Sequence, residues 1–167
     1  MSDVRVVHGR DEATISAVGP LRRQAWMTEI KVHLAADRFG IDDHDRRSWH
    51  FMISSADRLV AAGRLTACKS LDDLPDETSF GPYRAQMTTP VGFAGRLVVD
   101  PSYRHRGLAE RIIVARLDLA RTLRLAQVWG ETRRSDVDGL IPHGYVLRGD
   151  SLDCSVPGEW SILSVDL

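Results

Sequence analysis

The feature that most constrains the fold is a strand, a turn and a helix that follow one another between residues 91 and 124. The strand ends in the continuously apolar Leu97-Val98-Val99, which is typical of a central strand buried on both faces. From Gly107 to Arg124, apolar residues recur at helical spacing and predict an amphipathic helix. We therefore expect a sheet with at least one helix packed on it.

The turn between that strand and that helix has the chemistry of an anion site. It reads Arg104-His105-Arg106-Gly107-Leu108-Ala109. A helix N-terminus leaves about four N–H groups without intrahelical partners and carries partial positive charge. Gly107 and the small Ala109 let a bulky ligand approach the backbone closely, and two arginines add full charges. This combination predicts a pyrophosphate cradle; the alternative is an Arg-rich, solvated start of a helix.

The remaining pattern predicts an α+β (mixed α/β) layer of helices on a sheet. Residues 70–90 contain three prolines and few apolar residues, so they are expected to form a loop of functional or mobile character. The expected strands are Val4–His8, Trp49–Ile53, Leu59–Cys68, Val91–Val99, Ala126–Glu131, Tyr145–Arg148 and Trp160–Val165. The expected helices are Asp11–Ala17, capped by Asp11, then Leu21–Leu34 with Pro20 at its first turn, Gly107–Arg124 and Asp136–Ile141.

Length and composition exclude several classes of protein. A chain of 167 residues, 43% hydrophobic, suits one folded domain over residues 1–167. The net charge of −1 argues against a general nucleic-acid binder. No apolar run approaches the roughly 20 residues of a membrane span, and residues 1–10 lack the apolar region of a signal peptide. Cys68 and Cys154 complete no metal-ligand spacing and are typical of reduced thiols, which predicts a cytoplasmic protein without a metal.

The segment from Leu97 to Ala109 resembles the acyl-CoA-binding motif of the GCN5-related N-acetyltransferases, which is Arg/Gln-x-x-Gly-x-Gly/Ala after the fourth strand. The resemblance covers most of the chain. It implies a central, mostly antiparallel, twisted sheet of six to seven strands flanked by about four helices. It also implies acetyl-CoA, or another acyl-CoA, as co-substrate. The implied contacts are Leu97, Val98 and Val99 with pantetheine, and Arg104, His105, Arg106, Gly107, Leu108, Ala109 and Glu110 with pyrophosphate.

The N-terminal half looks like a subgroup of that family. Leu21-Arg22-Arg23-x-x-Trp26, Asp42-Asp43-x-Asp45, Trp49-His50 and Arg64-Leu65 resemble acyl-homoserine-lactone synthases, N-acyl amino acid synthases and small bacterial acetyltransferases. The chain lacks room for the extra elements of the larger synthases, which favours a small acetyltransferase.

Two departures from the family pattern concern catalysis. Many members carry a tyrosine as general acid four residues before a Gly-Phe turn. That turn is Gly144-Tyr145 in this chain, so Leu140 occupies the matching position. Some members place a glutamate on the fourth strand, whereas residues 91–99 contain no carboxylate. The base must therefore come from elsewhere in this chain or from water relays, whereas the thiolate can leave without the tyrosine acid because thiols have a pKa near 8.5.

Three residues are candidates for acid–base catalysis. An alkyl amine has a pKa near 10.4, so the protein must help to remove its proton at neutral pH. His50 lies on a predicted strand and is the first candidate, the alternative being a hydrogen-bonded strand histidine. Glu131, at the end of a strand, is the second, the alternative being a solvated strand end. Tyr145 is a candidate acid from the turn or, alternatively, a core aromatic.

Arg64, Arg96 and Trp26 are candidates for acceptor binding. Both arginines lie within apolar strands, where an unpaired arginine is rare. They are positioned to bind a substrate carboxylate or, alternatively, to form ion pairs with Asp42, Asp43 or Asp45. Trp26 either lines the same groove or packs in the core.

The sequence thus predicts an N-acetyltransferase that transfers an acetyl or short acyl group from CoA to the amine of a small molecule or peptide. Two alternatives stay open: a non-catalytic acyl-CoA-binding module, and an N-acyl synthase that uses longer acyl-CoA or acyl-carrier donors. No nucleic acid or membrane is expected as a partner. Homodimers are common in the family the chain resembles, so a homodimer also stays open.

Overall fold

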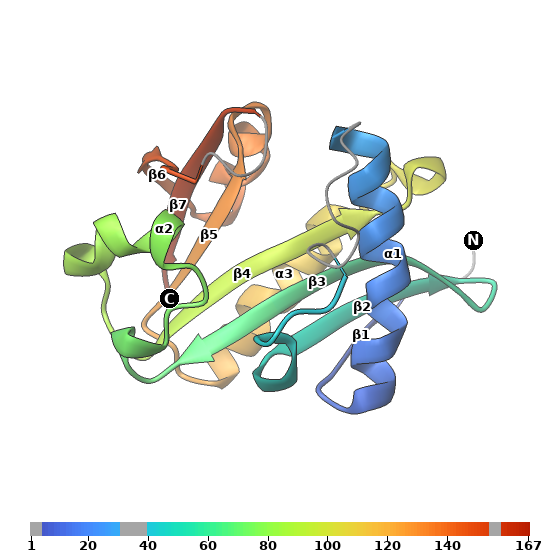
Figure 1. Cartoon of the computed structure of the whole chain (residues 1–167), viewed down its shortest axis with the longest axis horizontal. Coiled ribbons are helices and arrows are strands. Elements are labelled where there is room, and N and C mark those ends of the chain that lie inside the picture. Colours follow the sequence, from blue (N-terminus) through green and yellow to red (C-terminus); the bar gives the residue numbers. More distant parts are fainter. Residues whose placement is uncertain (1–4, 31–39, 154–157) are drawn as a thin grey trace. The chain divides into compact units, whose positions relative to one another are not determined.

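The computed structural model describes residues 5–30, 40–153 and 158–167, and these form an α+β fold (Figure 1). Seven strands make one sheet in the order β1-β2-β3-β4-β5-β7-β6. Their bounds are β1 Val6–Gly9, β2 Trp49–Ser55, β3 Arg58–Cys68, β4 Val91–Val99, β5 Gln127–Arg133, β6 Val146–Asp150 and β7 Trp160–Asp166. The α-helices are α1 Glu12–Ile30, α2 Glu77–Phe80 and α3 Leu108–Thr122. The β4–β5 pair is parallel, whereas β1–β2, β2–β3, β5–β7 and β6–β7 are antiparallel. The predicted fold class is confirmed.

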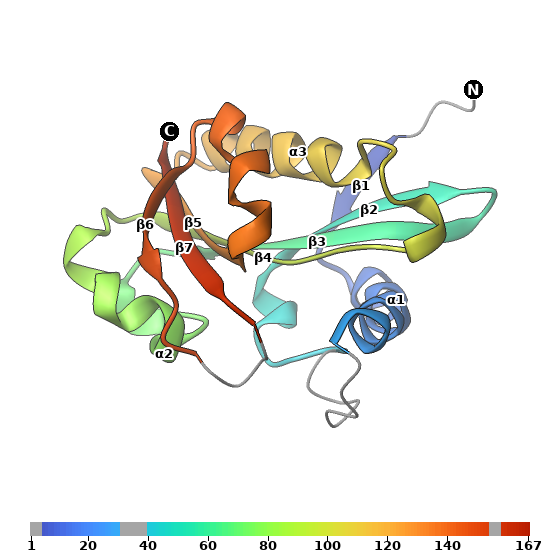
Figure 2. The ribbon, with the colours of Figure 1, turned by 90° about the horizontal axis from the view of Figure 1, so that it is seen from above.

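The chain divides into two compact units, of which the first is Met1–Thr66 with Arg96–Arg116. In this unit, β3 presents opposite faces to two helices (Figure 2). Ala62 packs in a buried cluster with Val18, Leu21 and Ala25 of α1 and Val98 of β4. The next residue, Gly63, faces α3, and a Cβ atom at this position would lie 2.7 Å from the side chain of Ile112. The glycine therefore allows α3 to lie close to the strand.

Helix α1 is continuous through Pro20, so the prediction of two helices separated at this proline was wrong. Proline lacks the N–H that would donate to the preceding turn, and this loss usually kinks or ends a helix. Here Val18, Leu21 and Ala25, on both sides of the proline, bury their side chains in the same cluster. Packing of this face compensates for the missing hydrogen bond. Asp11 caps the helix as predicted, because its carboxylate accepts from the N–H of Thr14 at 2.8 Å. Residues 31–34 of the predicted second helix lie outside the described residues.

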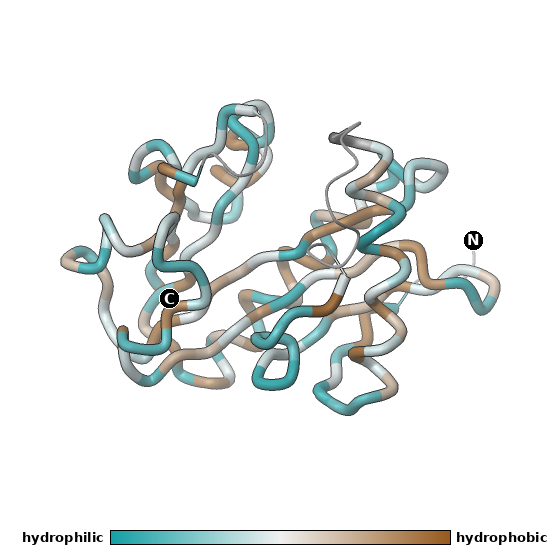
Figure 3. Tube along the Cα trace, in the orientation of Figure 1, coloured by the Kyte–Doolittle hydropathy of each residue, from teal (hydrophilic) through white to brown (hydrophobic). Residues whose placement is uncertain are grey.

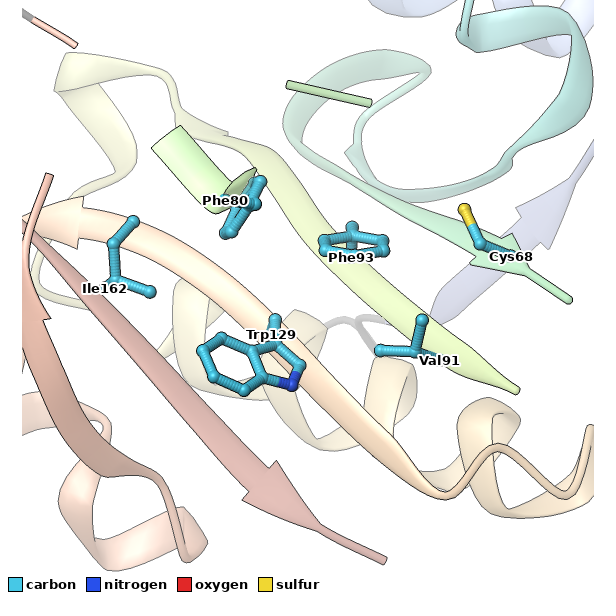
Figure 4. Packing of buried hydrophobic residues seen from close by; sticks show 6 residues of the cluster. All are labelled: Cys68, Phe80, Val91, Phe93, Trp129 and Ile162. Carbon is cyan, nitrogen blue, oxygen red and sulfur yellow. The ribbon is translucent and has the colours of Figure 1, made fainter. Parts of the chain in front are cut away.

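The second unit is Ala67–Gly95 with Leu117–Leu167. Its core is a cluster of Cys68, Phe80, Val91, Phe93, Trp129 and Ile162 (Figure 4). The rings of Phe80 and Phe93 lie 4.9 Å apart, and Trp129 is fully buried. Cys68 is a buried thiol whose Sγ donates to the carbonyl oxygen of Asp73 at 3.2 Å, whereas Cys154 lies outside the described residues. This cluster joins α2 to strands β4, β5 and β7.

Residues 70–90 are not the loop that their composition predicts. They form the 3₁₀ turns Leu71–Asp73 and Gly81–Gln86 with α2 between them. Phe80 is buried in the second unit's core, and Leu71, Leu74, Tyr83 and Met87 pack against the same cluster. These apolar side chains are too widely spaced in the sequence to show a helical period, but each of them packs in or against the core cluster of the second unit. Residues 136–141 likewise form 3₁₀ turns, Arg134–Gly139 and Ile141–His143, where a short helix was predicted.

The hydropathy of the chain follows this arrangement (Figure 3). Brown, hydrophobic stretches lie along several strands, and much of the teal, hydrophilic colour lies at turns. Among the described helices, none is both long and apolar enough to cross a membrane.

Candidate active site

The turn after β4 is held in place by the buried Asp100. Its carboxylate accepts a hydrogen bond from the N–H of Ser102 at 2.9 Å and pairs with Arg58 of β3. Its own N–H donates to the carbonyl oxygen of Val60 at 2.8 Å. The 3₁₀ turn Pro101–Tyr103 follows directly. The turn is therefore anchored to β3 before the chain reaches the predicted pyrophosphate cradle.

Helix α3 begins where the sequence predicts the cradle. His105 and Gly107 both have positive φ, at 58° and 73°, which turns the backbone into the helix. The first N–H that is bonded back is that of Arg111, which donates to the carbonyl oxygen of Gly107 at 3.1 Å. The N–H groups of Leu108, Ala109 and Glu110 precede it and point out of the helix end, as helix geometry requires. The positive end of the helix dipole lies at the same place.

The two arginines of the turn are ordered by contacts with the turn itself. Arg106 lies over the ring of Tyr103, 4.9 Å from its centroid, and donates to the carbonyl oxygen of Ser102 at 3.0 Å. The Nε of Arg104 lies 3.4 Å from the carbonyl oxygen of Val99. Both guanidinium groups therefore stay near the helix N-terminus and keep its potential positive.

Strand β4 changes conformation part-way along its length. In the second unit, the registered pairs between β4 and β5 run from Val91–Gln127 to Ala94–Gly130. In the first unit, Arg96 has a φ of +54°, which is rare for a residue with a side chain. Val98 is buried, while Leu97 and Val99 are half-buried. The three residues predicted to contact pantetheine thus follow a break in the regular strand.

A buried ion pair joins α1 to the turn before β2. Nη1 of Arg22 donates to both carboxylate oxygens of Asp45, at 2.8 and 3.0 Å, and both side chains are fully buried. Nη2 of Arg22 contacts Nδ1 of His50 at 3.1 Å. Because a guanidinium only donates, Nδ1 is the acceptor, and the ring proton lies on Nε2. Nε2 donates it to the carbonyl oxygen of Asp45 at 2.9 Å.

Both ring nitrogens of His50 therefore have partners inside the fold. Burial lowers the pKa of His50, and the charge of Arg22 lowers it further against the opposing effects of Asp45. The ring is neutral at pH 7 and orients Arg22. This is the arrangement of a hydrogen-bonded strand histidine, the alternative to the catalytic base expected from the sequence.

Arg64 and Arg96 meet the acidic residues of the same turn. Arg64 pairs with Asp42 and lies 3.1 Å from Asp45, while Arg96 donates to Asp42 at 2.7 Å. Burial raises the pKa of Asp42, but the two guanidinium groups lower it more, to about 2. Burial likewise opposes ionisation of Asp45, and Arg22 and Arg64 outweigh it, so its pKa is also lowered. The ion pairs predicted as an alternative to acceptor binding are present, and the acceptor role stays a prediction.

Trp26, the third predicted acceptor contact, is half-buried and packs against the α1 cluster of Val18, Leu21 and Ala25.

In the second unit, Glu131 of β5 lies in a polar cluster. The hydroxyl of Ser79, on α2, is 3.1 Å from Oε1 of Glu131, and the hydroxyl of Ser151 is 3.4 Å from that of Ser79. Burial raises the pKa of Glu131; hydrogen bonds from the two serines oppose this effect, and the charges of Asp76 and Asp153 add to it. Glu131 is a half-buried carboxylate with a raised pKa, whereas the alternative predicted a solvated strand end.

Comparison with known proteins identifies the family. The profile of the acetyltransferase (GNAT) domain matches residues 21–114. The chain belongs to the GNAT acetyltransferase family. A search of curated proteins finds no match to this sequence.

Solved structures of GNAT type share the whole fold with this chain. ElaA from Escherichia coli is 15% identical, with a TM-score of 0.73, over 98% of this chain and 99% of that one. An acyl-CoA N-acyltransferase from Pseudomonas aeruginosa is 16% identical, with a TM-score of 0.71, over 98% and 99% of the two chains. BjaI, a CoA-dependent acyl-homoserine lactone synthase solved with SAM and isopentyl-CoA, is 16% identical, with a TM-score of 0.73, over 98% and 82%. At these identities, the likeness to the solved structures shows a shared fold.

This GNAT chain lacks the tyrosine acid at the position of Leu140, which lies between the 3₁₀ turns that follow β5. Tyr145, the candidate acid that follows the turn Ile141–His143 and Gly144, is buried with 5% of its surface exposed. That burial agrees with the core aromatic predicted as the alternative. Within the described residues, no group of three or more histidines, cysteines, aspartates or glutamates is arranged to hold a metal ion.

Sequence reasoning missed the polar partners of the candidate residues. Ser79 lies in α2, within residues that were predicted to form a loop, and Ser151 follows the short strand β6. No spacing signal connects either serine to Glu131, because their contacts span 52 and 20 positions of sequence. Arg22 did carry a signal, since a lone arginine on the apolar face of a helix needs a buried partner.

Proposed function

We propose that this GNAT protein is an acyl-CoA-dependent N-acetyltransferase, which transfers an acetyl or another short acyl group directly from CoA to an amine of a small molecule or peptide. The observation that carries the proposal is the turn from Arg104 to Gly107 at the N-terminus of α3. The N–H groups of Leu108, Ala109 and Glu110 at the helix end, the helix dipole and the two arginines of the turn suit an anion with several oxygen acceptors.

The residues of the turn fit a pyrophosphate. A Cβ atom at Gly107 would meet nothing closer than Oε2 of Glu110, at 4.0 Å, so the backbone is open to a ligand on that side. Gly107 has a positive φ, and any residue with a side chain would be strained in this backbone conformation. The proposed contacts to CoA are Leu97, Val98 and Val99 for pantetheine, and residues 104–110 for the phosphates.

Acyl-CoA supplies an activated thioester, so the chain has to orient two substrates and move one proton. Orientation alone is worth about 7–11 kcal/mol of the barrier. Backbone N–H groups near Val98 or Val99 are the proposed donors to the carbonyl oxygen, where negative charge develops. The thiolate is a tolerable leaving group, because thiols have a pKa near 8.5. The absence of a tyrosine at Leu140 is therefore compatible with turnover.

In this proposal, Glu131 is the base that removes the proton of the acceptor amine. At pH 7, only about 1 in 2,500 molecules of an alkyl amine with a pKa near 10.4 is unprotonated. His50 uses both ring nitrogens inside the fold, and Tyr145 is buried. Glu131 combines a raised pKa with a place on β5 one residue past Gly130, where the registered β4–β5 pairs end.

Arg96 is the better of the two proposed arginine contacts to the acceptor. Its side chain is 22% exposed, against 9% for Arg64, and it pairs with the half-buried Asp42, whereas Arg64 also pairs with the fully buried Asp45. An acceptor with a carboxylate near its amine would compete with Asp42 for this guanidinium. Trp26 is the proposed apolar contact.

A thermal-shift titration with acetyl-CoA, free CoA and decanoyl-CoA tests the CoA site. Ligand at 100 times its Kd stabilises a protein by about 2.7 kcal/mol, which for this chain length raises Tm by roughly 5–11 °C. We expect similar shifts with acetyl-CoA and CoA. The absence of a shift with all three ligands would contradict the proposal.

Thiol release with a panel of amines then separates a transferase from a binding module. Release that depends on the amine supports transfer. CoA binding without release for any amine would instead support the non-catalytic alternative. Tighter binding of decanoyl-CoA than of acetyl-CoA would favour the N-acyl synthase.

A further inference from the structure

The hydroxyl of Ser79 is shared by two carboxylates. Its Oγ lies 3.1 Å from Oε1 of Glu131 and 3.1 Å from Oδ2 of Asp76. A serine hydroxyl has one proton to donate, so it can donate to only one of the two at a time. A proton on either carboxylate would let that carboxylate donate to Oγ while the serine donates to the other. The same positions of the heavy atoms therefore serve two different placements of the proton.

The three side chains also form a path from the interior towards solvent. Ser79 is fully buried, whereas Asp76 is half-buried at the start of α2. Asp76 is held there because its Oδ1 accepts from the N–H of Ser79 at 3.0 Å. Ser151 and Asp153, which follow β6, complete the polar surroundings of Glu131. A proton that arrives at Glu131 thus has a buried hydroxyl between it and the half-buried carboxylate of Asp76.

We propose that Glu131, Ser79 and Asp76 form a proton relay that carries the proton of the acceptor amine from the active site to water. The inference rests on the proposed function, and it adds Ser79 and Asp76 as positioning and relay residues. The amine proton bonds to a carboxylate oxygen of Glu131. Glu131 then passes a proton to Oγ of Ser79, Ser79 passes its own to Oδ2 of Asp76, and Asp76 releases it to water. One O–H bond breaks for each that forms, and no redox change occurs.

In the relay, the side chain of Glu131 has a hydrogen bond in both of its protonation states. When Glu131 is ionised, Ser79 donates to it. When Glu131 is protonated, it donates to Ser79, which turns its proton to Asp76. Burial raises the pKa of Glu131, and the negative charges of Asp76 and Asp153 add to this effect, so Glu131 is a stronger base than a solvated glutamate.

The first test compares pH–rate profiles of Ser79→Ala, Asp76→Asn and wild type with an alkyl amine acceptor. Asn keeps the cap of α2 but cannot take the proton. A general-base pathway contributes about 10²–10⁴-fold. We expect both variants to lose about 10²-fold in kcat at pH 7, and this deficit to shrink towards pH 10, where the amine loses its proton unaided. Ser164→Ala is the matched control, because Ser164 is also fully buried in β7 but bonds to Arg148.

A deficit that is equal at every pH would overturn the relay, since a structural defect does not follow the ionisation of the amine. A wild-type profile in Ser79→Ala would overturn it as well. CoA binding by each variant, measured by titration calorimetry, shows that the cradle is intact.

Infrared spectroscopy tests the relay without turnover. The carboxyl stretch of protonated Glu131 is identified by its loss in Glu131→Gln. We expect Ser79→Ala to shift the frequency and the titration midpoint of this band, and an unchanged band would overturn the relay. If wild type binds CoA but acylates no amine, the proposed transfer fails, and the infrared result alone decides whether the three groups share a proton.

Discussion

Loss of the charge on Asp45 is expected to destabilise the fold strongly. Asp45 and Arg22 are both fully buried, and Arg22 donates to both oxygens of this carboxylate. The backbone N–H of Asp42 and the guanidinium of Arg64 donate to it as well, at 2.8 and 3.1 Å. Asp45→Asn keeps the size and shape of the side chain, so it removes the charge without creating a cavity.

The magnitude follows from the burial of the arginine. Removal of one partner of a buried ion pair typically costs about 3–5 kcal/mol, because the other charge stays in a medium that solvates it poorly. In a chain of this length, each kcal/mol lowers Tm by about 2–4 °C, so Asp45→Asn should lower Tm by roughly 6–20 °C. The expected loss is a large part of a total stability of about 5–15 kcal/mol.

Urea unfolding followed by circular dichroism measures this effect at pH 7. Asp43→Asn is the matched control: it makes the same substitution two residues away on an exposed side chain. We expect that control to change the unfolding free energy by less than about 0.5 kcal/mol. If Asp45→Asn and Asp43→Asn agree within 1 kcal/mol, the buried ion pair does not stabilise the fold as argued.

Two further predictions concern the cradle and the acidic turn. Gly107→Glu should abolish CoA binding in calorimetry while the circular dichroism spectrum is retained, because it adds a negative charge at a backbone position with φ of 73°. Gly139→Glu should bind CoA normally, because a Cβ atom at Gly139 would meet no atom within 4 Å outside its two chain neighbours. Unchanged affinity in Gly107→Glu would refute the cradle. The pKa of Asp42 is lowered to about 2 in the fold, so its contribution to stability is present above pH 4 and is lost as the pH falls from about 4 to 2. Asp42→Asn should therefore be less stable than wild type at pH 6 in urea titrations and should approach it near pH 2, and a constant difference would contradict the assignment.

Local sequence determined the central strand, the turn and the helix that follow one another between residues 91 and 122. Strand β4 has the predicted bounds, and α3 begins one residue after Gly107. The interactions that decide this segment are short-range: apolar periodicity, the cap at Asp100 and the conformational freedom of Gly107. The β2–β3 hairpin was predictable for the same reason, because its turn at Ala56 and Asp57 needs no distant partner.

Tertiary packing decided what the local signals could not. Pro20 lies inside α1 because residues on both sides of it pack in the same core cluster. Burial of Phe80 stabilises a helical segment within the largely polar residues 70–90. The pairing of charges depends on the fold in the same way. Three of the four residues at 42–45 are acidic, and only the fold selects Asp45 for Arg22 and Asp42 for Arg96.

The sequence by itself therefore pointed to the family and the fold class, and it determined the strand, turn and helix of the proposed cradle, which rest on residues close together in the chain. The tertiary structure alone decided that His50 orients Arg22 and that Glu131 shares a hydroxyl with Asp76. The physical reason is that protonation and hydrogen bonding depend on burial and on atoms about 3 Å away. In a folded chain those atoms come from residues tens of positions apart, and no sequence period records them.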